Sequence, residues 1–138
     1  MHATPQHPER FDYLVDAEQA LDAAQMLRTP YCLLGHTHVP WFAEYDRDSR
    51  RLTRVVTQAG ALREVRLPAE RERFRCIMNP GSVGQPRDGD PRASAAVLDA
   101  GAGTFAVRRV VYDVAEAQRK IRGAELPAFL ADRLAAGH

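Results

Sequence analysis

The chain contains 138 residues, and 19 Lys and Arg against 18 Asp and Glu give a formal net charge of +1. Its 45% hydrophobic and 27% charged residues are close to the globular average, which excludes a disordered, collagen-like or coiled-coil chain. The length suits one domain, and the near-neutral charge gives no electrostatic basis for binding nucleic acid or an anionic membrane. No stretch approaches the roughly 18 apolar residues of a membrane span, and residues 1–10 lack the apolar core of a secretory signal. We therefore expect a single cytoplasmic domain over residues 1–138, without a nucleic-acid or membrane partner.

The first part of the chain predicts one helix and one short strand. Residues 1–13 are rich in Pro and His and show no periodicity, so we expect an irregular loop there. From Asp16, which can cap a helix, apolar residues follow helical spacing to Leu27, and Pro30 ends the helix. Residues 31–34 are a continuous apolar run between a proline and a glycine, which is typical of a fully buried strand of the parallel type.

The remainder is predicted to be mostly β-structure. Residues 41–78 contain four short apolar or alternating runs, WFAEYD, LTRVVTQ, ALREVRL and FRCIM, which favour a strand meander. Residues 79–94 hold three Pro and three Gly, which indicates a long structured loop. A hairpin should follow with its turn at residues 100–103, and helical spacing predicts two terminal helices over 115–122 and 127–136.

Two further patterns carry expectations about burial. Cys32 and Cys76 lie inside apolar runs and not at framework spacing, so we expect reduced thiols in the core, not a disulfide or a metal pair. Arg71, Arg73 and Arg75 recur at every second position, which favours a solvated strand face over a nucleic-acid site.

Two of the five histidines, His36 and His38, directly follow the short strand. In extended backbone, residues i and i+2 project to the same face, so both imidazoles could converge on one metal or on adjacent metals. Gly35 before them would let the chain turn where a side chain would obstruct it. The alternative is a surface histidine pair that happens to flank a threonine.

The stretches LLGHTHVP (33–40) and NPGSVGQPRDGDPRAS (79–94) together resemble the calcineurin-like metallophosphoesterases, and specifically their small bacterial and archaeal phosphodiesterase-type branch. Residues 2–5, His-Ala-Thr-Pro, with the following Pro8 and Tyr13, resemble the family's H-G-x-P loop, with alanine in place of glycine. The resemblance spans nearly the whole chain. It implies an α/β fold, the C-terminal half of a four-layer αββα sandwich, with one helix before the GHTH motif.

The resemblance also implies chemistry. The family hydrolyses phosphoesters at two metals that clamp the phosphate and activate a bridging water. Carried over by motif, His2 and His36 match ligands of one metal, and His38 matches a ligand of the other. Imidazole ligands are compatible with Mn, Zn, Fe or Ni, so they do not select the divalent ion. The expected substrate is a small-molecule phosphoester, and substrate identity depends on segments that these motifs do not include.

The family's D-x-H, G-D and G-N-H motifs, which supply the bridging carboxylate and further ligands, are not found ahead of this region. We therefore expect a partial domain that derives from a truncated reading frame, an alternative start or a fragment. Three imidazoles could hold one metal but lack the negative charge that stabilises two adjacent divalent cations. Two hypotheses follow: a phosphodiesterase, or a catalytically incompetent half-domain that acts only with another copy, as a homo-oligomer, or with a separate N-terminal half.

The loop over residues 79–94 offers further candidates. Asn79, Gly81 and Ser82 could shape the loop beside the site or contact substrate directly, and the loop's prolines and glycines favour the first role. Arg87 could bind a phosphate in bidentate fashion, or Asp88 could instead occupy it in an ion pair.

Two other histidine-rich enzyme classes are less compatible with the sequence. A cupin needs a glutamate close behind H-x-H and a later histidine, and no histidine lies between His38 and His138. A metallo-β-lactamase-like hydrolase needs Asp-His directly after H-x-H, where this chain has Val39, Pro40 and Trp41.

Overall fold

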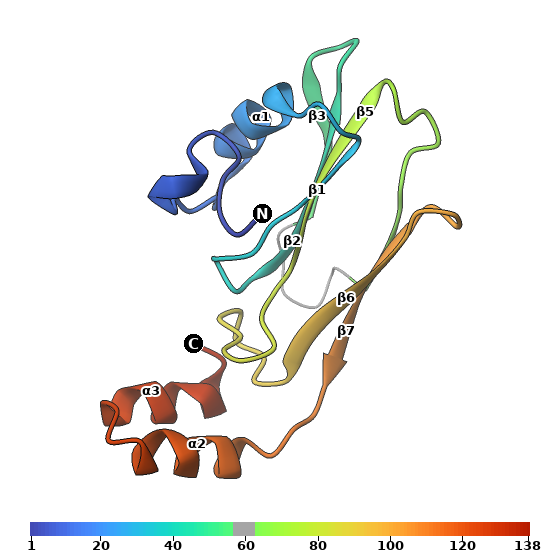
Figure 1. Ribbon diagram of the computed structural model, residues 1–138. Coiled ribbons are helices and arrows are strands. Elements are labelled where there is room, and N and C mark those ends of the chain that lie inside the picture. Colours follow the sequence, from blue (N-terminus) through green and yellow to red (C-terminus); the bar gives the residue numbers. More distant parts are fainter. Residues whose placement is uncertain (57–62) are drawn as a thin grey trace.

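The computed structural model describes residues 1–56 and 63–138, which fold into two β-sheets with helices around them (Figure 1). The first sheet has the strand order β1 (Tyr31–Leu33), β5 (Phe74–Pro80), β2 (Pro40–Asp46) and β3 (Arg51–Val56). The second has the order β4 (Glu64–Arg66), β7 (Thr104–Val110) and β6 (Ala93–Asp99). The helices are α1 (Ala17–Met26), α2 (Val114–Gly123) and α3 (Ala128–Asp132), with short 3₁₀ turns η1 (Pro8–Arg10) and η2 (Arg133–Ala136).

The first sheet is buried on both faces. Along β2, successive side chains point to opposite faces, so Trp41 packs with Ala20 of α1 on one side. Phe42 packs with Phe105 of β7 on the other side, which places the second sheet against that face. The resulting order of layers is helix, sheet, sheet, which confirms the predicted α/β class.

The predicted first helix is confirmed. The carboxylate of Asp16 accepts a hydrogen bond from the backbone N–H of Gln19 at 2.8 Å, which satisfies one of the free donors at the helix start. The helix ends at Met26, ahead of Pro30 as expected.

The predicted meander is wrong in its connections, although all four runs contain strands. β2 and β3 form an antiparallel hairpin, but β4 joins the second sheet and β5 returns to lie between β1 and β2. Val65 of β4 is buried with Phe105, so the apolar position of this run belongs to the interface between the sheets. Alternation alone does not say which neighbour a strand will pair with. The ends of two predicted runs, at residues 57, 58, 61 and 62, lie outside the described residues.

Strand β1 is shorter and less buried than expected. It pairs in parallel with β5, which confirms the parallel type, but Leu33 is 45% exposed. β1 lies at the edge of the sheet and has a neighbouring strand on one side only.

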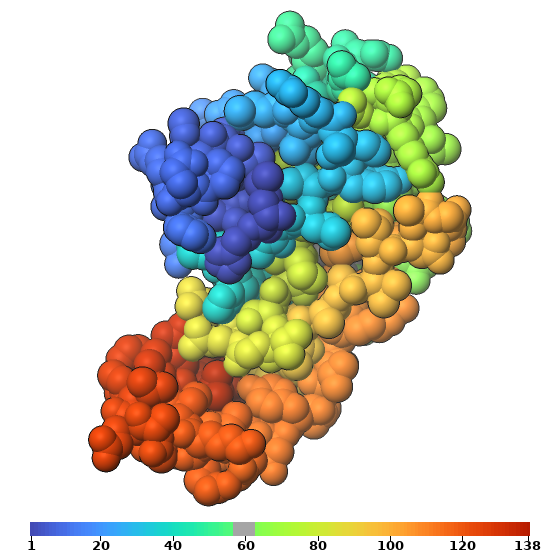
Figure 2. Space-filling model, in the orientation of Figure 1, coloured from blue at the N-terminus to red at the C-terminus, as the bar shows by residue number. Residues whose placement is uncertain are grey.

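The predicted C-terminal elements are confirmed. β6 and β7 form the expected hairpin, and the second terminal helix continues from α3 into η2. The space-filling view shows these terminal helices, in red, as a lobe that projects from the body (Figure 2). No helix in the described ranges is long and apolar enough to cross a membrane.

The burial expectations are met for the cysteines and not for all the arginines. Cys32 and Cys76 are free and buried, and burial raises the pKa of the Cys76 thiol to about 12. Arg75 is buried, contrary to the predicted solvated face, and its guanidinium donates to the backbone carbonyls of Leu27 and Phe74. A guanidinium can be buried here because several carbonyl acceptors surround it.

Asp46 is buried at the end of β2 and accepts two hydrogen bonds of 2.8 Å from the guanidinium of Arg73. These bonds hold the pKa of the Asp46 carboxyl well below its usual range. A carboxyl group whose pKa is depressed in the folded protein stabilises the fold at pH values above the pKa of the unfolded chain, about 3.9. This stabilisation is lost as the pH falls toward the pKa of the folded state. We predict that Asp46→Asn lowers the free energy of unfolding at pH 7 and that its deficit relative to the unsubstituted chain shrinks below about pH 4.

Urea denaturation at pH 7 and at pH 3.5 measures both effects. Asp48→Asn is the matched control, because Asp48 is 3.3 Å from the same arginine but its side chain is 72% exposed. A deficit of equal size at both pH values would contradict the role assigned to the Asp46 carboxylate.

Candidate functional site

The three candidate histidines lie near the end of β1. His2 runs alongside this strand because the Met1 nitrogen donates to the Leu33 carbonyl and the Gly35 N–H donates to the His2 carbonyl, both at 2.9 Å. His36 and His38 follow in the loop after β1. Backbone hydrogen bonds therefore bring residue 2 next to residue 36.

The imidazoles of His2 and His36 are in direct contact. The Nε2 of His2 and the Nδ1 of His36 are 3.0 Å apart, and the two ring centroids are 4.8 Å apart. Two nitrogens bound tetrahedrally to one zinc ion at about 2.05 Å would lie about 3.3 Å apart. The observed distance is that of a hydrogen bond between the two rings. It also lies within a few tenths of an ångström of the metal-ligand value, so a single metal could take the place of this hydrogen bond.

Aromatic side chains hold the His36 ring. Tyr13 stacks on it with centroids 4.2 Å apart and an angle of 27° between the planes. Phe11 lies 6.1 Å from His36 and 5.9 Å from His2 between centroids. Tyr13 belongs to the segment that resembles the H-G-x-P loop, and its contact with His36 was not predicted from the sequence.

The backbone of the loop differs from the sequence-based expectation. His36 and His38 have φ values of 67° and 61°, in the left-handed region, and are not extended. Their imidazoles therefore do not share a face through the period of a strand. Gly35 is also not required sterically, because a Cβ there would meet the His2 backbone oxygen at an ordinary 3.8 Å.

His38 has a different environment from the pair. Its Nδ1 is 2.8 Å from the carbonyl oxygen of Gln85. A carbonyl only accepts, so Nδ1 carries the proton, and Nε2 of the neutral ring is left with its lone pair. Histidines that bind metals are commonly oriented by such a hydrogen bond from the other ring nitrogen. Burial lowers the pKa of His38, and the positive charge of Arg87 lowers it further, so the neutral form is favoured.

The described residues do not form a complete metal site. Within residues 1–56 and 63–138, no group of three or more His, Cys, Asp or Glu side chains is arranged to hold a metal ion. The structure thus joins His2 to His36 and places His38 two residues further along the loop, and the three do not form one group of metal-binding side chains. The assignment of all three as metal ligands stays a prediction.

Asn79, at the end of β5, connects the histidine loop to the sheet. Its side chain is fully buried, and its amide nitrogen donates to the Gly35 carbonyl at 3.0 Å and to the Thr37 hydroxyl at 2.9 Å. Its amide oxygen accepts from the N–H of Gly81 at 2.9 Å. One side chain therefore fixes the start of the histidine loop and the start of the loop over residues 79–94.

Gly81 and Ser82 shape the turn after β5. Gly81 has a φ of 83°, and a Cβ there would lie 2.8 Å from the Ser94 hydroxyl, so glycine is required. The Ser82 hydroxyl accepts from the N–H of Gln85 at 2.9 Å, which directs the chain back toward His38. These contacts stabilise the conformation of the loop.

Arg87 and Asp88 do not pair with each other. The guanidinium of Arg87 donates to the side-chain oxygen of Gln85 at 2.9 Å and 3.3 Å, and its backbone N–H donates to the His38 carbonyl at 3.3 Å. Asp88 instead forms a buried ion pair with Arg109 of β7. Among the described residues no carboxylate lies within ion-pair distance of Arg87, whose only described side-chain acceptor is the neutral Gln85.

Comparisons with known proteins agree with this architecture. A crystal structure of a metallophosphoesterase from Sphaerobacter thermophilus matches all of this chain at a TM-score of 0.83 and 37% sequence identity, over 54% of its own chain. The uncharacterized protein MJ0912 of Methanocaldococcus jannaschii is 31% identical over 99% of this chain and 50% of its own length. A crystal structure of the hypothetical protein PH1004 from Pyrococcus horikoshii shares the fold at a TM-score of 0.66 and 17% identity.

No family model matches the chain. The chain spans about half the length of the relatives that it matches. Over its whole length the chain is therefore similar to about half of one metallophosphoesterase, consistent with the C-terminal half that its motifs predicted.

The Asn79 contacts predict a large effect on stability. Asn79→Ala would leave the Gly35 carbonyl, the Thr37 hydroxyl and the Gly81 N–H without this partner, and a buried polar group left without a partner costs about 1–3 kcal/mol. We expect the free energy of unfolding, measured in urea, to fall by at least about 2 kcal/mol. Ser82→Ala, which removes one half-buried acceptor, should cost less than about 1 kcal/mol. An equal loss of unfolding free energy in the two variants would contradict the conclusion that Asn79 stabilises the two loops more than Ser82 does.

Proposed function

We propose that this chain contributes to metal-dependent hydrolysis of a small-molecule phosphoester, with His2 and His36 as ligands of one divalent metal and His38 as a ligand of a second. The observation that supports this proposal most strongly is the 3.0 Å contact between ring nitrogens of His2 and His36. Two residues 34 positions apart are brought to a spacing that suits a shared metal, in a chain that is 37% identical to a metallophosphoesterase.

The metals would supply Lewis acidity and an activated water for attack on phosphorus. The chain's own residues prepare the donors for this role. Asn79 fixes the histidine loop, the Gln85 carbonyl keeps the proton of His38 on Nδ1, and Tyr13 holds the plane of the His36 ring. A neutral imidazole is the form that binds a cation, and burial, by lowering the pKa of His38, favours that form of this histidine.

Arg87 is the proposed phosphate-binding residue. Its guanidinium is near enough to His38 to lower the pKa of that histidine, and its side-chain hydrogen bonds go to an uncharged amide. A guanidinium paired with a neutral group keeps its charge available for a phosphate oxygen, which it can bind through two N–H groups. Asn79, Gly81 and Ser82 are proposed to support the loop that carries it.

A second candidate function is that of a half-domain that acts only with another copy or with a separate N-terminal half. It is favoured by the donor set, because the described residues form no group of three metal-binding side chains and the histidine pair includes no carboxylate. Two adjacent divalent cations repel each other, and anionic ligands between them offset this repulsion. A completing segment would then have to supply those carboxylates.

Titration calorimetry with Zn²⁺ and Mn²⁺ tests the metal assignment. We expect binding that weakens by at least about 10-fold in His36→Ala and in His38→Ala, since even groups that only orient a ligand are worth 10–100-fold in affinity. His7→Ala is the matched control, because the side chain of His7 is 58% exposed and its Nδ1 lies 3.6 Å from the carboxylate of Glu9. Equal affinity in all four proteins would contradict the assignment.

Turnover of bis(p-nitrophenyl) phosphate, measured over a range of chain concentrations with the mass in solution recorded alongside, separates the two candidate functions. A rate per chain that is independent of concentration, and that is lost in His36→Ala, supports hydrolysis by the single chain. A rate per chain that rises as the chain associates supports completion by a second copy. Absence of turnover together with His-dependent metal binding supports the half-domain.

A further inference from the structure

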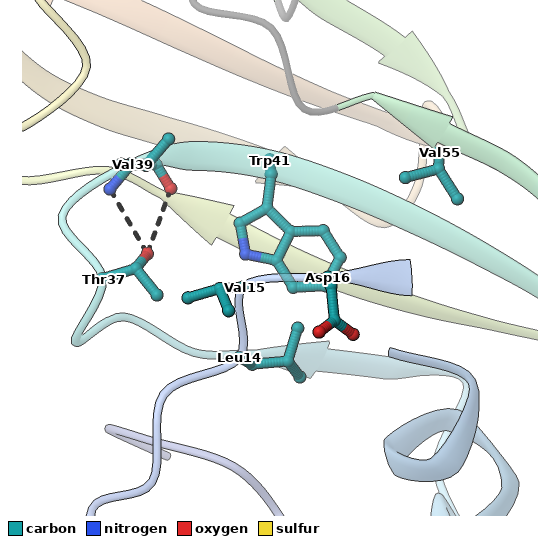
Figure 3. A pocket seen from close by; sticks show the side chains of 7 residues that line it. All are labelled: Leu14, Val15, Asp16, Thr37, Val39, Trp41 and Val55. Carbon is teal, nitrogen blue, oxygen red and sulfur yellow. Dashed lines mark hydrogen bonds between the residues drawn. The ribbon is translucent and has the colours of Figure 1, made fainter. Parts of the chain in front are cut away.

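A small cavity lies behind the histidine loop, where the start of α1 meets β2 and β3 (Figure 3). Its volume is about 130 Å³, and its lining is almost entirely apolar. The lining residues are Leu14, Val15, Asp16, Thr37, Val39, Trp41 and Val55. Neither the proposed metal ligands nor Arg87 is among them.

The cavity contains an unpartnered hydrogen-bond donor. Trp41 is only 6% exposed, and its indole Nε1 is buried with no hydrogen-bond partner among the residues that the structure describes. Figure 3 shows this nitrogen on the edge of the ring that faces Thr37 and Val15. A buried donor without an acceptor is costly, so its presence in a cavity calls for an acceptor beyond the residues that the structure describes, and a bound ligand would supply one.

The other polar groups of the lining are already engaged. The hydroxyl of Thr37 accepts from Asn79 at 2.9 Å and from the N–H of Val39 at 3.3 Å. The carboxylate of Asp16 caps α1 through Gln19 and lies on the exposed side of the cavity. The indole N–H is thus the polar group left to orient a ligand, and the negative charge of Asp16 disfavours an anion.

We propose that this cavity binds a small uncharged molecule, one five- or six-membered ring with a carbonyl-type oxygen that accepts a hydrogen bond from the Trp41 indole. The size follows from the volume, since an engineered apolar cavity of about 150 Å³ holds one benzene molecule. The acceptor follows from the unpartnered N–H, and the absence of charge follows from the apolar lining and from Asp16. A phosphate group does not fit this chemistry, so the site is separate from the proposed phosphoester site.

The cavity is connected to the candidate site through the chain. Leu14 and Val15 directly follow Tyr13, whose ring stacks on His36, and Thr37 and Val39 alternate with the histidines on one loop. A ligand in the cavity contacts the segments that position His36. Occupancy should therefore shift the NMR signals of the His36 ring as well as those of Trp41.

The sequence contains one tryptophan, so the full chain gives a single indole N–H signal in a ¹H–¹⁵N NMR spectrum. Cyclohexanone is the probe, because it is an uncharged six-membered ring with one carbonyl. We expect a saturable downfield shift of the Trp41 N–H signal, as occurs when a free donor gains an acceptor. Inorganic phosphate at the same concentrations should cause no shift.

Val15→Phe places a larger side chain at the 67% exposed wall of the cavity and should weaken cyclohexanone binding at least about 10-fold. Val83→Phe is the matched control, because Val83 is 66% exposed and lies outside the cavity. Val55→Phe blocks the opposite wall and replaces Val15→Phe if that variant does not give a folded spectrum. The proposal is overturned if cyclohexanone gives no saturable shift, if the shift survives both blocking substitutions, or if phosphate produces the same shift.

Discussion

The buried amide of Asn79 is the contact on which the arrangement of the candidate site depends. It lies at the end of β5, and its three hydrogen bonds join the loop after β1 to the turn after β5. Because β1 and β5 run in parallel, their carboxyl ends meet at the same edge of the sheet. One side chain can therefore fix both loops, and through them the histidines and the segment that carries Gln85 and Arg87.

The charges around the site divide into two groups with different roles. Asp88 and Arg109 neutralise each other in a buried ion pair that ties the loop over residues 79–94 to the second sheet. Arg87 has a neutral partner, and burial favours the uncharged form of His38. In the proposed site the imidazoles would be the donors to a metal and Arg87 the cation for a phosphate. Among the described residues, no group of three metal-binding side chains includes a carboxylate that could serve a two-metal centre.

Much of the fold could be predicted from sequence because the signals were local. The cap at Asp16, the turn after Asp99 and the apolar run before Gly35 depend on neighbouring residues, and the structure contains the corresponding helix, hairpin and strand. Strand order was not predictable in this way. The alternating pattern around Val65 is the same whichever sheet its strand joins. Its place in the second sheet depends on burial beside Phe105, which is distant in sequence.

The motifs nominated candidate site residues, whose roles stay predictions, but they did not predict the geometry of these residues. Motif resemblance singled out His2, His36, His38 and Asn79, but the left-handed backbone of His36 and His38 has no local signal of the kind that a glycine gives. The partner of Asp88 was also missed, because Arg109 lies 21 positions away on β7 and comes close only in the folded chain. Both the loop backbone and the Asp88 ion pair depend on contacts between residues far apart in the chain, and no short sequence pattern records such contacts.

The most direct measurement is the protonation state of each imidazole, from long-range ¹H–¹⁵N NMR correlations at pH 8 before and after addition of Zn²⁺. The chain has five histidines, of which His7 and His138 serve as internal controls. The structure predicts that His38 is protonated on Nδ1 throughout. It also predicts that zinc replaces the hydrogen bond between His2 and His36, with the donor ring's proton moving to its other nitrogen, so that the signals of both rings shift together. Signals of His2 and His36 that stay unchanged, or shift no more than those of His7 and His138, would contradict a metal site at this pair.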